Sequence, residues 1–208
     1  MQNMNLPPLR LPRAILFDMD GTLTEPLLDF PRIKAEMGIG NRPILESLAM
    51  MTPADRQAAE AILHRHEDQA AQSCRLNEGC ESLLRWLDEH HIPQAIITRN
   101  SRSCARIILD RHRLAIEILI TREDGPFKPD PHPLLLACKQ LNVNPAEAWM
   151  VGDGVYDVQA AHHAEIPSIW LSHGKPRPFA DEPAHTIAQL PNLLLLLQAL
   201  RDKGDNCA

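Results

Sequence analysis

The sequence predicts an α/β protein in which a parallel β-sheet is flanked by helices and interrupted by one inserted helical segment. Two observations predict this fold. Short apolar runs alternate with amphipathic stretches over most of the chain, and one long stretch near the N-terminus has no strand pattern. With 208 residues, 44% of them hydrophobic and 23% charged, the chain is long enough for a buried core and has the composition of a globular protein.

Five apolar runs predict buried strands, because each is short and bounded by turn or polar residues. They are Ala14–Phe17, Ala95–Thr98, Ile116–Ile120, Ala148–Val151 and Ser168–Leu171. The alternation of such runs with helical stretches favours parallel pairing, because each helix can carry the chain back to the start of the next strand.

Amphipathic stretches between the later runs predict helices, because apolar residues recur in them at helical spacing. They are Cys80–His90, Ser101–Arg111, Pro131–Leu141 and Val155–Ala164. The segment Pro176–Ala184 is rich in proline and polar residues and predicts a loop, which a final helix around Leu193–Arg201 follows.

The segment 24–77 predicts an inserted helical domain. It shows no convincing strand, and it contains a long helical pattern from about Pro53 to Ser73. We therefore divide the chain into a core formed by residues 1–23 and 78–208 and a helical cap formed by residues 24–77. Because the insertion follows the first strand directly, the cap should stand over the carboxyl ends of the strands, where open α/β sheets bind ligands.

Composition excludes several classes of partner. The net charge of -6 and the aromatic share of 4% argue against nucleic acid and anionic membranes, and no segment has the length of a signal peptide or a membrane span. Five cysteines, an odd number without the spacing of a zinc site, favour reduced thiols and a cytoplasmic location. We expect a monomer or a homodimer.

Two acidic residues directly follow the first predicted strand. Asp18 and Asp20 are one residue apart, a spacing that would point both side chains the same way in a strand. Crowded carboxylates are unfavourable unless a cation or a shared proton relieves their repulsion. The pair therefore predicts a metal ion.

Two further motifs supply groups that bind anions. Thr98 and the backbone N–H of Arg99 lie between a predicted strand and a predicted helix, and free N–H groups at a helix start bind anions. Lys128 is followed by Pro129, whose fixed φ limits the movement of the lysine loop. These residues predict a phosphate site.

A second acidic pair follows the strand Ala148–Val151. Asp153 and Asp157 are four residues apart, which places both on one face of a helix's first turn, where they could meet the first pair. Together with the threonine and the lysine, the four acids could bind a divalent cation and a phosphate at one edge of the sheet.

The order of these motifs resembles that of the haloacid dehalogenase superfamily. The four matching motifs are Asp18-Met19-Asp20-Gly21-Thr22, Thr98, Lys128 with Pro129, and Gly152-Asp153 with Asp157. Any one of them is a weak signal, but four in the expected order are a strong one. The resemblance implies a Rossmann-like parallel sheet with a small helical cap inserted after the first strand, as in the phosphoglycolate phosphatase-like branch.

The resemblance also implies a magnesium-dependent phosphatase that hydrolyses a small phosphorylated metabolite, a phosphomonoester, through an aspartyl-phosphate. Asp18 would attack the phosphorus, and Asp20 would protonate the leaving oxygen and later activate water. Mg²⁺ would be held by Asp18, Asp153 and the backbone carbonyl of Asp20, while Asp157 would orient metal-bound water.

Three residues would bind the substrate phosphate in this scheme. Lys128 would balance the charge of Asp18 and of the transferring phosphoryl group. Thr98 and the N–H of Arg99 would donate hydrogen bonds to phosphate oxygens.

The predicted cap carries scattered positive charge. These residues could receive an anionic part of the substrate beyond its phosphate, or could equally form a solvated face. They are Arg32, Lys34, Arg42, Arg56 and Arg65. No pattern in the cap identifies the substrate.

Two other functions are compatible with the same motifs. A sugar phosphomutase would use the same aspartyl-phosphate, although the pairing of Gly21 with Thr22 resembles phosphatases more. A non-catalytic sensor of phosphate or phosphoprotein would keep the fold without turnover, and the intact acidic, threonine and lysine motifs argue against it. A dehalogenase is disfavoured because the resemblance associates Asp20 with phosphoryl transfer.

Overall fold

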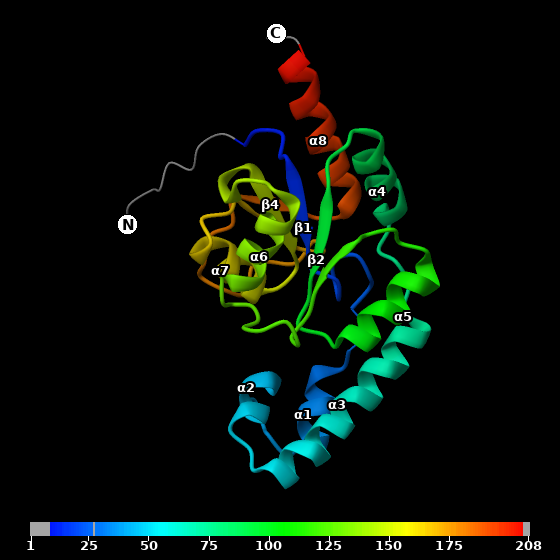
Figure 1. The fold of residues 1–208 in the computed structure, drawn as a ribbon, viewed down its shortest axis with the longest axis vertical. Coiled ribbons are helices and arrows are strands. Elements are labelled where there is room, and N and C mark those ends of the chain that lie inside the picture. The colour runs from blue at the N-terminus through cyan, green and yellow to red at the C-terminus, as the bar shows by residue number, and fades with distance from the viewer. Residues whose placement is uncertain (1–8, 27, 206–208) are drawn as a thin grey trace.

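The computed structural model describes residues 9–26 and 28–205, which form a six-stranded parallel sheet between two layers of helices (Figure 1). The strand order is β3-β2-β1-β4-β5-β6, and each neighbouring pair is parallel. The strands are β1 (Ala14–Phe17), β2 (Gln94–Ile97), β3 (Ile118–Ile120), β4 (Ala148–Gly152), β5 (Ser168–Leu171) and β6 (His185–Ile187). The predicted α/β fold with a parallel sheet is confirmed.

The sixth strand was not predicted from the sequence. β6 is three residues long, pairs with β5 at the edge of the sheet, and exposes two of its three residues. Its sequence, His185-Thr186-Ile187, contains no apolar run, because only one residue reaches the core. The strand forms because its backbone pairs with β5. A hydrophobic pattern in the sequence does not predict such pairing.

Alternation along the strands builds two separate apolar layers. In β1, Ile15 and Phe17 pack with α4 (Cys80–Glu89), α5 (Arg102–His112) and α8 (Leu190–Asp205). Ala14 and Leu16 point to the opposite face and pack with α6 (His132–Leu141) and α7 (Val155–His163). A short 3₁₀ helix, Pro145–Glu147, leads into β4. All four residues of β1 are fully buried, as expected for a central parallel strand.

The inserted helical cap contains α1 (Phe30–Glu36), α2 (Ile44–Ala49) and α3 (Pro53–Ser73). Thr52 caps α3 by accepting a hydrogen bond from the Asp55 N–H at 3.3 Å, and Pro53 occupies the first turn, where its missing N–H costs nothing. The cap has its own apolar cluster of six buried residues, Ile33, Ile39, Ile44, Leu48, Ala59 and Leu63. The long predicted helix is confirmed.

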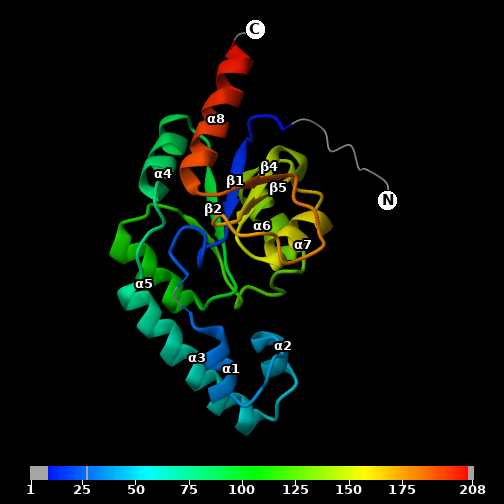
Figure 2. The ribbon, with the colours of Figure 1, turned by 180° about the vertical axis from the view of Figure 1, so that it is seen from behind.

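The cap lies at one end of the molecule, and α3 returns from it to pack against α5 (Figure 2). Thr24 and Leu76 form an antiparallel bridge where the chain leaves and re-enters the core. The Asn77 amide donates to the carbonyls of Gly21, Thr22 and Thr24 at 2.7–3.1 Å. We retain residues 24 and 77 as the proposed limits of the cap domain.

No helix in the described part of the chain is long and apolar enough to cross a membrane.

Candidate active site

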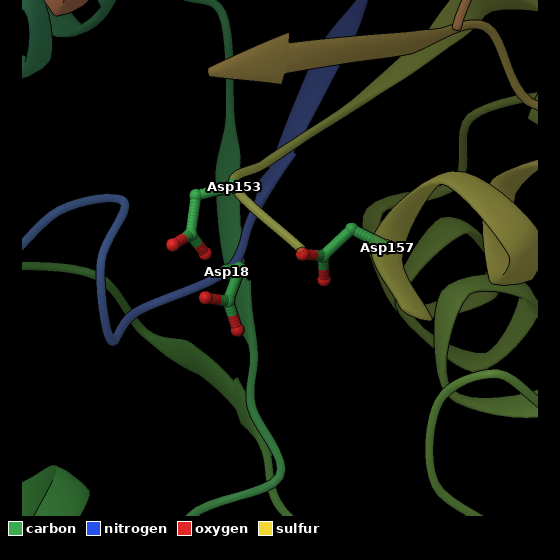
Figure 3. A group of neighbouring side chains, drawn as sticks. All are labelled: Asp18, Asp153 and Asp157. Atoms are coloured by element: carbon green, nitrogen blue, oxygen red, sulfur yellow. The ribbon is translucent and has the colours of Figure 1, made fainter. Parts of the chain in front are cut away.

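The carboxyl ends of three adjacent strands bring the sequence motifs together. Asp18 follows β1, Thr98 follows β2, and Asp153 follows β4, and β1 lies between the other two strands. Because the three strands are parallel, their carboxyl ends meet at one edge of the sheet. In Figure 3 the carboxylates of Asp18, Asp153 and Asp157 converge on one region at this edge.

Lys128 is the central cation of this site. Its ammonium donates to Asp18 Oδ1 at 2.7 Å, to Asp157 Oδ1 at 2.6 Å and to the carbonyl of Ile97 at 2.6 Å. The residue is only 2% exposed, so three acceptors replace the water that its ammonium has lost. Burial lowers the pKa of Lys128, but the two carboxylates raise it by more, and its pKa lies above the ordinary value. The lysine is therefore charged and fixed in position.

The acidic cluster carries more negative charge than Lys128 balances. Ligand oxygens of Asp18, Asp153 and Asp157 lie within 4.8 Å of one another. Burial, together with the neighbouring carboxylates, raises the pKa of Asp18 well above its ordinary value and that of Asp153 to about 7. Burial is the larger cause of both shifts, and repulsion between the carboxylates adds to it.

The chemistry of this cluster fits a hard divalent cation. Its donors are carboxylate oxygens, the ligands that Mg²⁺ prefers, and two glycines leave room for them. A Cβ at Gly21, whose φ is +87°, would lie 2.3 Å from Asp153 Oδ2, and a Cβ at Gly152 would lie 2.3 Å from Asp157 Cγ. The glycines of both motifs thus permit the close approach of the acids.

Asp157 differs from the other two acids because its oxygens already have partners. Oδ1 accepts from Lys128, and Oδ2 accepts from the Gly154 N–H at 3.0 Å, which also secures the start of α7. The Asp157 carboxylate is therefore engaged by the protein itself.

Asp20 lies on the other side of the site, in contact with the loop that follows β2. Its carboxylate accepts from the Asn100 amide at 3.1 and 3.3 Å and from the Thr98 hydroxyl at 3.4 Å. Burial raises the pKa of Asp20, and the hydrogen bond from Asn100 opposes this shift without cancelling it. The raised pKa suits a group that gives and takes a proton. The role of the Asn100 side chain was not predicted, although the residue is part of the same loop.

Arg99 contributes a side chain that connects core and cap. Its guanidinium lies over the rings of Phe127 and Tyr156, 4.8 and 4.1 Å from their centroids, and forms an ion pair with Glu46 of α2 at 2.8 Å. It also donates to the carbonyl of Lys128. The sequence indicated only the backbone N–H of this residue, because the partners are distant in the chain.

A second ion pair joins cap and core in a more buried setting. Arg122, in the loop after β3, donates to both carboxylate oxygens of Glu67 on α3, the longer contact being 2.9 Å. The Arg122 side chain is 11% exposed and that of Glu67 is 3% exposed. Arg122 also donates to the carbonyl of Arg99 at 3.2 Å, so this pair fixes the loop that carries the predicted phosphate-binding residues.

A cavity of about 380 Å³ lies between the acidic cluster and the cap. Its core side contains the predicted residues Asp18, Asp20, Thr98, Arg99, Lys128, Asp153 and Asp157. Its cap side is mostly apolar and is formed by Leu28, Phe30, Ile44, Leu45 and Leu63, with Lys34 beside them. The structure thus brings all of the predicted site residues to one cavity that a small molecule would fill.

A model of the family "Haloacid dehalogenase-like hydrolase" matches residues 29–171 of this chain. A haloacid dehalogenase-like hydrolase domain-containing protein of Arabidopsis thaliana is 34% identical over 70% of the chain, which spans 64% of that protein's length. A plasmid-encoded phosphoglycolate phosphatase of Cupriavidus necator is 30% identical, with 87% of this chain and 92% of that protein covered.

An N-acetylmuramic acid 6-phosphate phosphatase of Pseudomonas putida is also 30% identical, over 78% of this chain and 83% of that protein. Among solved structures, a hydrolase from Pseudomonas syringae superposes with a TM-score of 0.74 at 21% identity, covering 87% of this chain and 97% of that one. At that identity the structural likeness bears on the fold alone.

Proposed function

We propose that this chain, which belongs to the haloacid dehalogenase-like hydrolase family, is a magnesium-dependent phosphatase that cleaves a small phosphomonoester through an aspartyl-phosphate. The family match confirms the resemblance drawn from the four motifs. The relatives named for an activity are phosphatases, and the chain is accordingly a phosphoric monoester hydrolase. The metal, the intermediate and the substrate are the parts that we propose.

The observation that carries the proposal is the convergence of Asp18, Lys128 and the further acids on one cavity. Asp18 Oδ1 is engaged by Lys128, and we assign the other oxygen to the attack on phosphorus. As that P–O bond forms, the bond from phosphorus to the ester oxygen breaks, and its electron pair passes to the leaving oxygen. Lys128 lies where it would balance the negative charge at Asp18.

Asp20 is the residue that we assign to proton transfer. Its raised pKa, due to burial, favours the protonated form that donates to the leaving oxygen. The resulting carboxylate then takes a proton from water, whose oxygen attacks phosphorus and breaks the bond to Asp18. Asn100 holds the Asp20 carboxylate in place through both steps.

The proposed metal ligands are Asp18, Asp153 and the backbone carbonyl of Asp20. When bound, Mg²⁺ would supply the positive charge that the cluster lacks and would shield Asp18 from an anionic phosphate. Asp157 would orient the metal's water rather than bind the ion, because Lys128 and Gly154 already occupy its oxygens. Thr98 and the Arg99 N–H would bind phosphate oxygens.

The proposed partner is a small phosphorylated metabolite, because the cavity is small and lies under a small cap. The relatives are named for different substrates, so the names alone do not select one. Four of the five cysteines are unpaired and buried, which supports the proposed cytoplasmic location, and Cys207 lies outside the described residues.

Hydrolysis of p-nitrophenyl phosphate tests the proposal. We expect turnover that requires Mg²⁺, stops with EDTA and returns when Mg²⁺ is added in excess. Asp18→Asn should reduce turnover at least about 10⁴-fold while far-UV circular dichroism stays unchanged. Asp110→Asn is the matched control, since Asp110 is exposed on α5. An active Asp18→Asn protein would exclude the aspartyl-phosphate, and binding of phosphomonoesters without turnover would favour the sensor.

A further inference from the structure

We propose that the cavity selects phosphomonoesters whose leaving group ends in a carboxylate, and that Lys34 of the cap binds this carboxylate. The proposal rests on the proposed phosphatase function, since it assumes that the phosphate is bound at the edge of the sheet that carries Asp18, Asp153 and Asp157. We call this edge the acidic edge. The cap's cations differ in whether a group of the protein already binds them and in whether they face the cavity.

Four of the five basic residues singled out in the cap have roles within the cap. Their side chains donate to a carboxylate or to backbone carbonyls that belong to the cap itself. The acceptors are Glu36 for Arg32 and Arg65, the carbonyl of Ile39 for Arg42, and the carbonyls of Leu48 and Ala49 for Arg56. These arginines stabilise the cap and do not line the cavity.

Lys34 is the exception. It lines the cavity, and it lies four residues after Phe30 on the same face of α1, which also lines the cavity. Ile33 points instead into the apolar cluster of the cap and is fully buried. The Lys34 ammonium donates to the carbonyl of Asn41 at 3.4 Å, a long contact, and no carboxylate among the described residues pairs with it.

The other cations of the cavity are neutralised. Lys128 is bound to Asp18 and Asp157, Arg99 to Glu46 and Arg122 to Glu67. Within the described part of the chain, Lys34 is therefore the cavity cation without a carboxylate partner. It lies on the cap side, opposite the acidic edge where the phosphate would be bound.

The surroundings of Lys34 define the class of leaving group. One ammonium balances one negative charge, which fits a carboxylate better than a second phosphate with two. The neighbouring wall is apolar, with Leu28, Phe30, Ile44, Leu45 and Leu63, so hydroxyl groups there would lose water without gaining a partner. A short leaving group with an anionic end and few hydroxyls fits this wall.

Two phosphomonoesters that differ only at the far end provide the test. In 3-phosphoglycerate this end is a carboxylate, and in glycerol 3-phosphate it is a hydroxymethyl group. We expect kcat/KM to favour 3-phosphoglycerate by at least about tenfold. Lys34→Met should lower kcat/KM for 3-phosphoglycerate by about tenfold to a hundredfold, as expected for a lost charged hydrogen bond, and change glycerol 3-phosphate little. Lys34→Arg should keep most of the preference.

Arg32→Met is the matched control, because it removes the same charge from the same helix at a side chain bound to Glu36. This variant should leave the preference unchanged. An equal effect of Arg32→Met and Lys34→Met would overturn the proposal, since it would assign the preference to the net charge of the cap. A Lys34→Met protein that loses activity equally on both substrates would overturn it as well.

Calorimetric binding of the two ligands to Asp18→Asn protein separates this inference from the proposed function. We expect 3-phosphoglycerate to bind more tightly, and Lys34→Met in that background to remove the difference. If the wild-type protein turns over no phosphomonoester but this binding preference is present, the phosphatase proposal fails and the assignment of Lys34 stands. Equal binding of the two ligands refutes the assignment of Lys34 even if the protein is an active phosphatase.

Discussion

The acidic edge of the sheet and the helical cap use charged residues in opposite ways. At the edge of the sheet, Lys128 and the carboxylates around it are buried and lie at the ends of strands that are themselves fully packed. In the cap, the buried cluster is apolar, and ion pairs such as Arg32–Glu36 lie at the surface.

In the proposed function, this difference assigns catalysis to the edge of the sheet and substrate recognition to the cap. Buried charges in fixed positions can hold a nucleophile, a proton donor and a metal ion in register, because each group is immobilised by its partners. The cap packs three helices around a small apolar cluster and leaves one lysine facing the cavity. A change in the cap should alter which substrate is accepted, whereas a change at the edge of the sheet should remove the reaction.

The largest effect is expected from Lys128→Met. The substitution leaves Asp18 and Asp157 buried without their cation, which should lower the free energy of unfolding by about 3–5 kcal/mol and abolish turnover of p-nitrophenyl phosphate. Urea unfolding measures the first effect. Lys139→Met, at an exposed position on α6, should change neither stability nor activity. An active and stable Lys128→Met protein would show that the buried charge at the edge of the sheet is needed neither for stability nor for turnover.

An intermediate effect is expected at the contacts between cap and core, where two ion pairs differ in burial. Glu67→Gln should lower the free energy of unfolding by about 2–3 kcal/mol, because it leaves Arg122 largely buried without its charge partner. Glu46→Gln should cost less than about 1 kcal/mol, since the Glu46 side chain is 40% exposed. Equal losses in urea unfolding would show that burial does not distinguish the two pairs.

The smallest effect is expected at the surface of the cap. Hydrogen bonds from His66 and Arg32 lower the pKa of Glu36 from 4.5 to about 2. Because the folded-state pKa is depressed, the stabilisation by Glu36 is complete above about pH 4.5 and is lost as the pH falls towards 2. Glu36→Gln should therefore be less stable than wild type at pH 6, and the difference should narrow below pH 4.5. Urea midpoints over this range measure it, and a constant difference would contradict the linkage.

Core elements were predicted closely because their hydrophobic patterns are local. The runs Ala14–Phe17 and Ser168–Leu171 coincide with β1 and β5, and Pro53–Ser73 coincides with α3. The final helix is longer than expected at both ends, Leu190–Asp205 rather than about Leu193–Arg201, because the buried Leu190 adds to its apolar face and the exposed Asp202 and Lys203 continue it beyond the apolar run. β6 was missed because its pairing depends on the neighbouring strand rather than on its own side chains.

In the candidate site, too, local features could be predicted from the sequence and contacts between distant segments could not. Asp18 and Asp153 could be predicted because each immediately follows an apolar strand, and parallel strands end at a common edge. The partners of Arg99 and Arg122 could not be predicted, because Glu46 and Glu67 belong to the inserted cap and approach the core only after both parts have folded.

The sequence by itself determined the parallel α/β fold, the inserted helices and the set of residues that carry the proposed chemistry, because strand periodicity and short motifs are local properties. The tertiary structure alone decided which cap cation faces the cavity. Arg32 and Lys34 are two residues apart on α1, yet the first is bound to Glu36 and the second lines the cavity. That choice depends on how the helix packs against its neighbours, and packing brings together residues whose separation in the chain carries no signal.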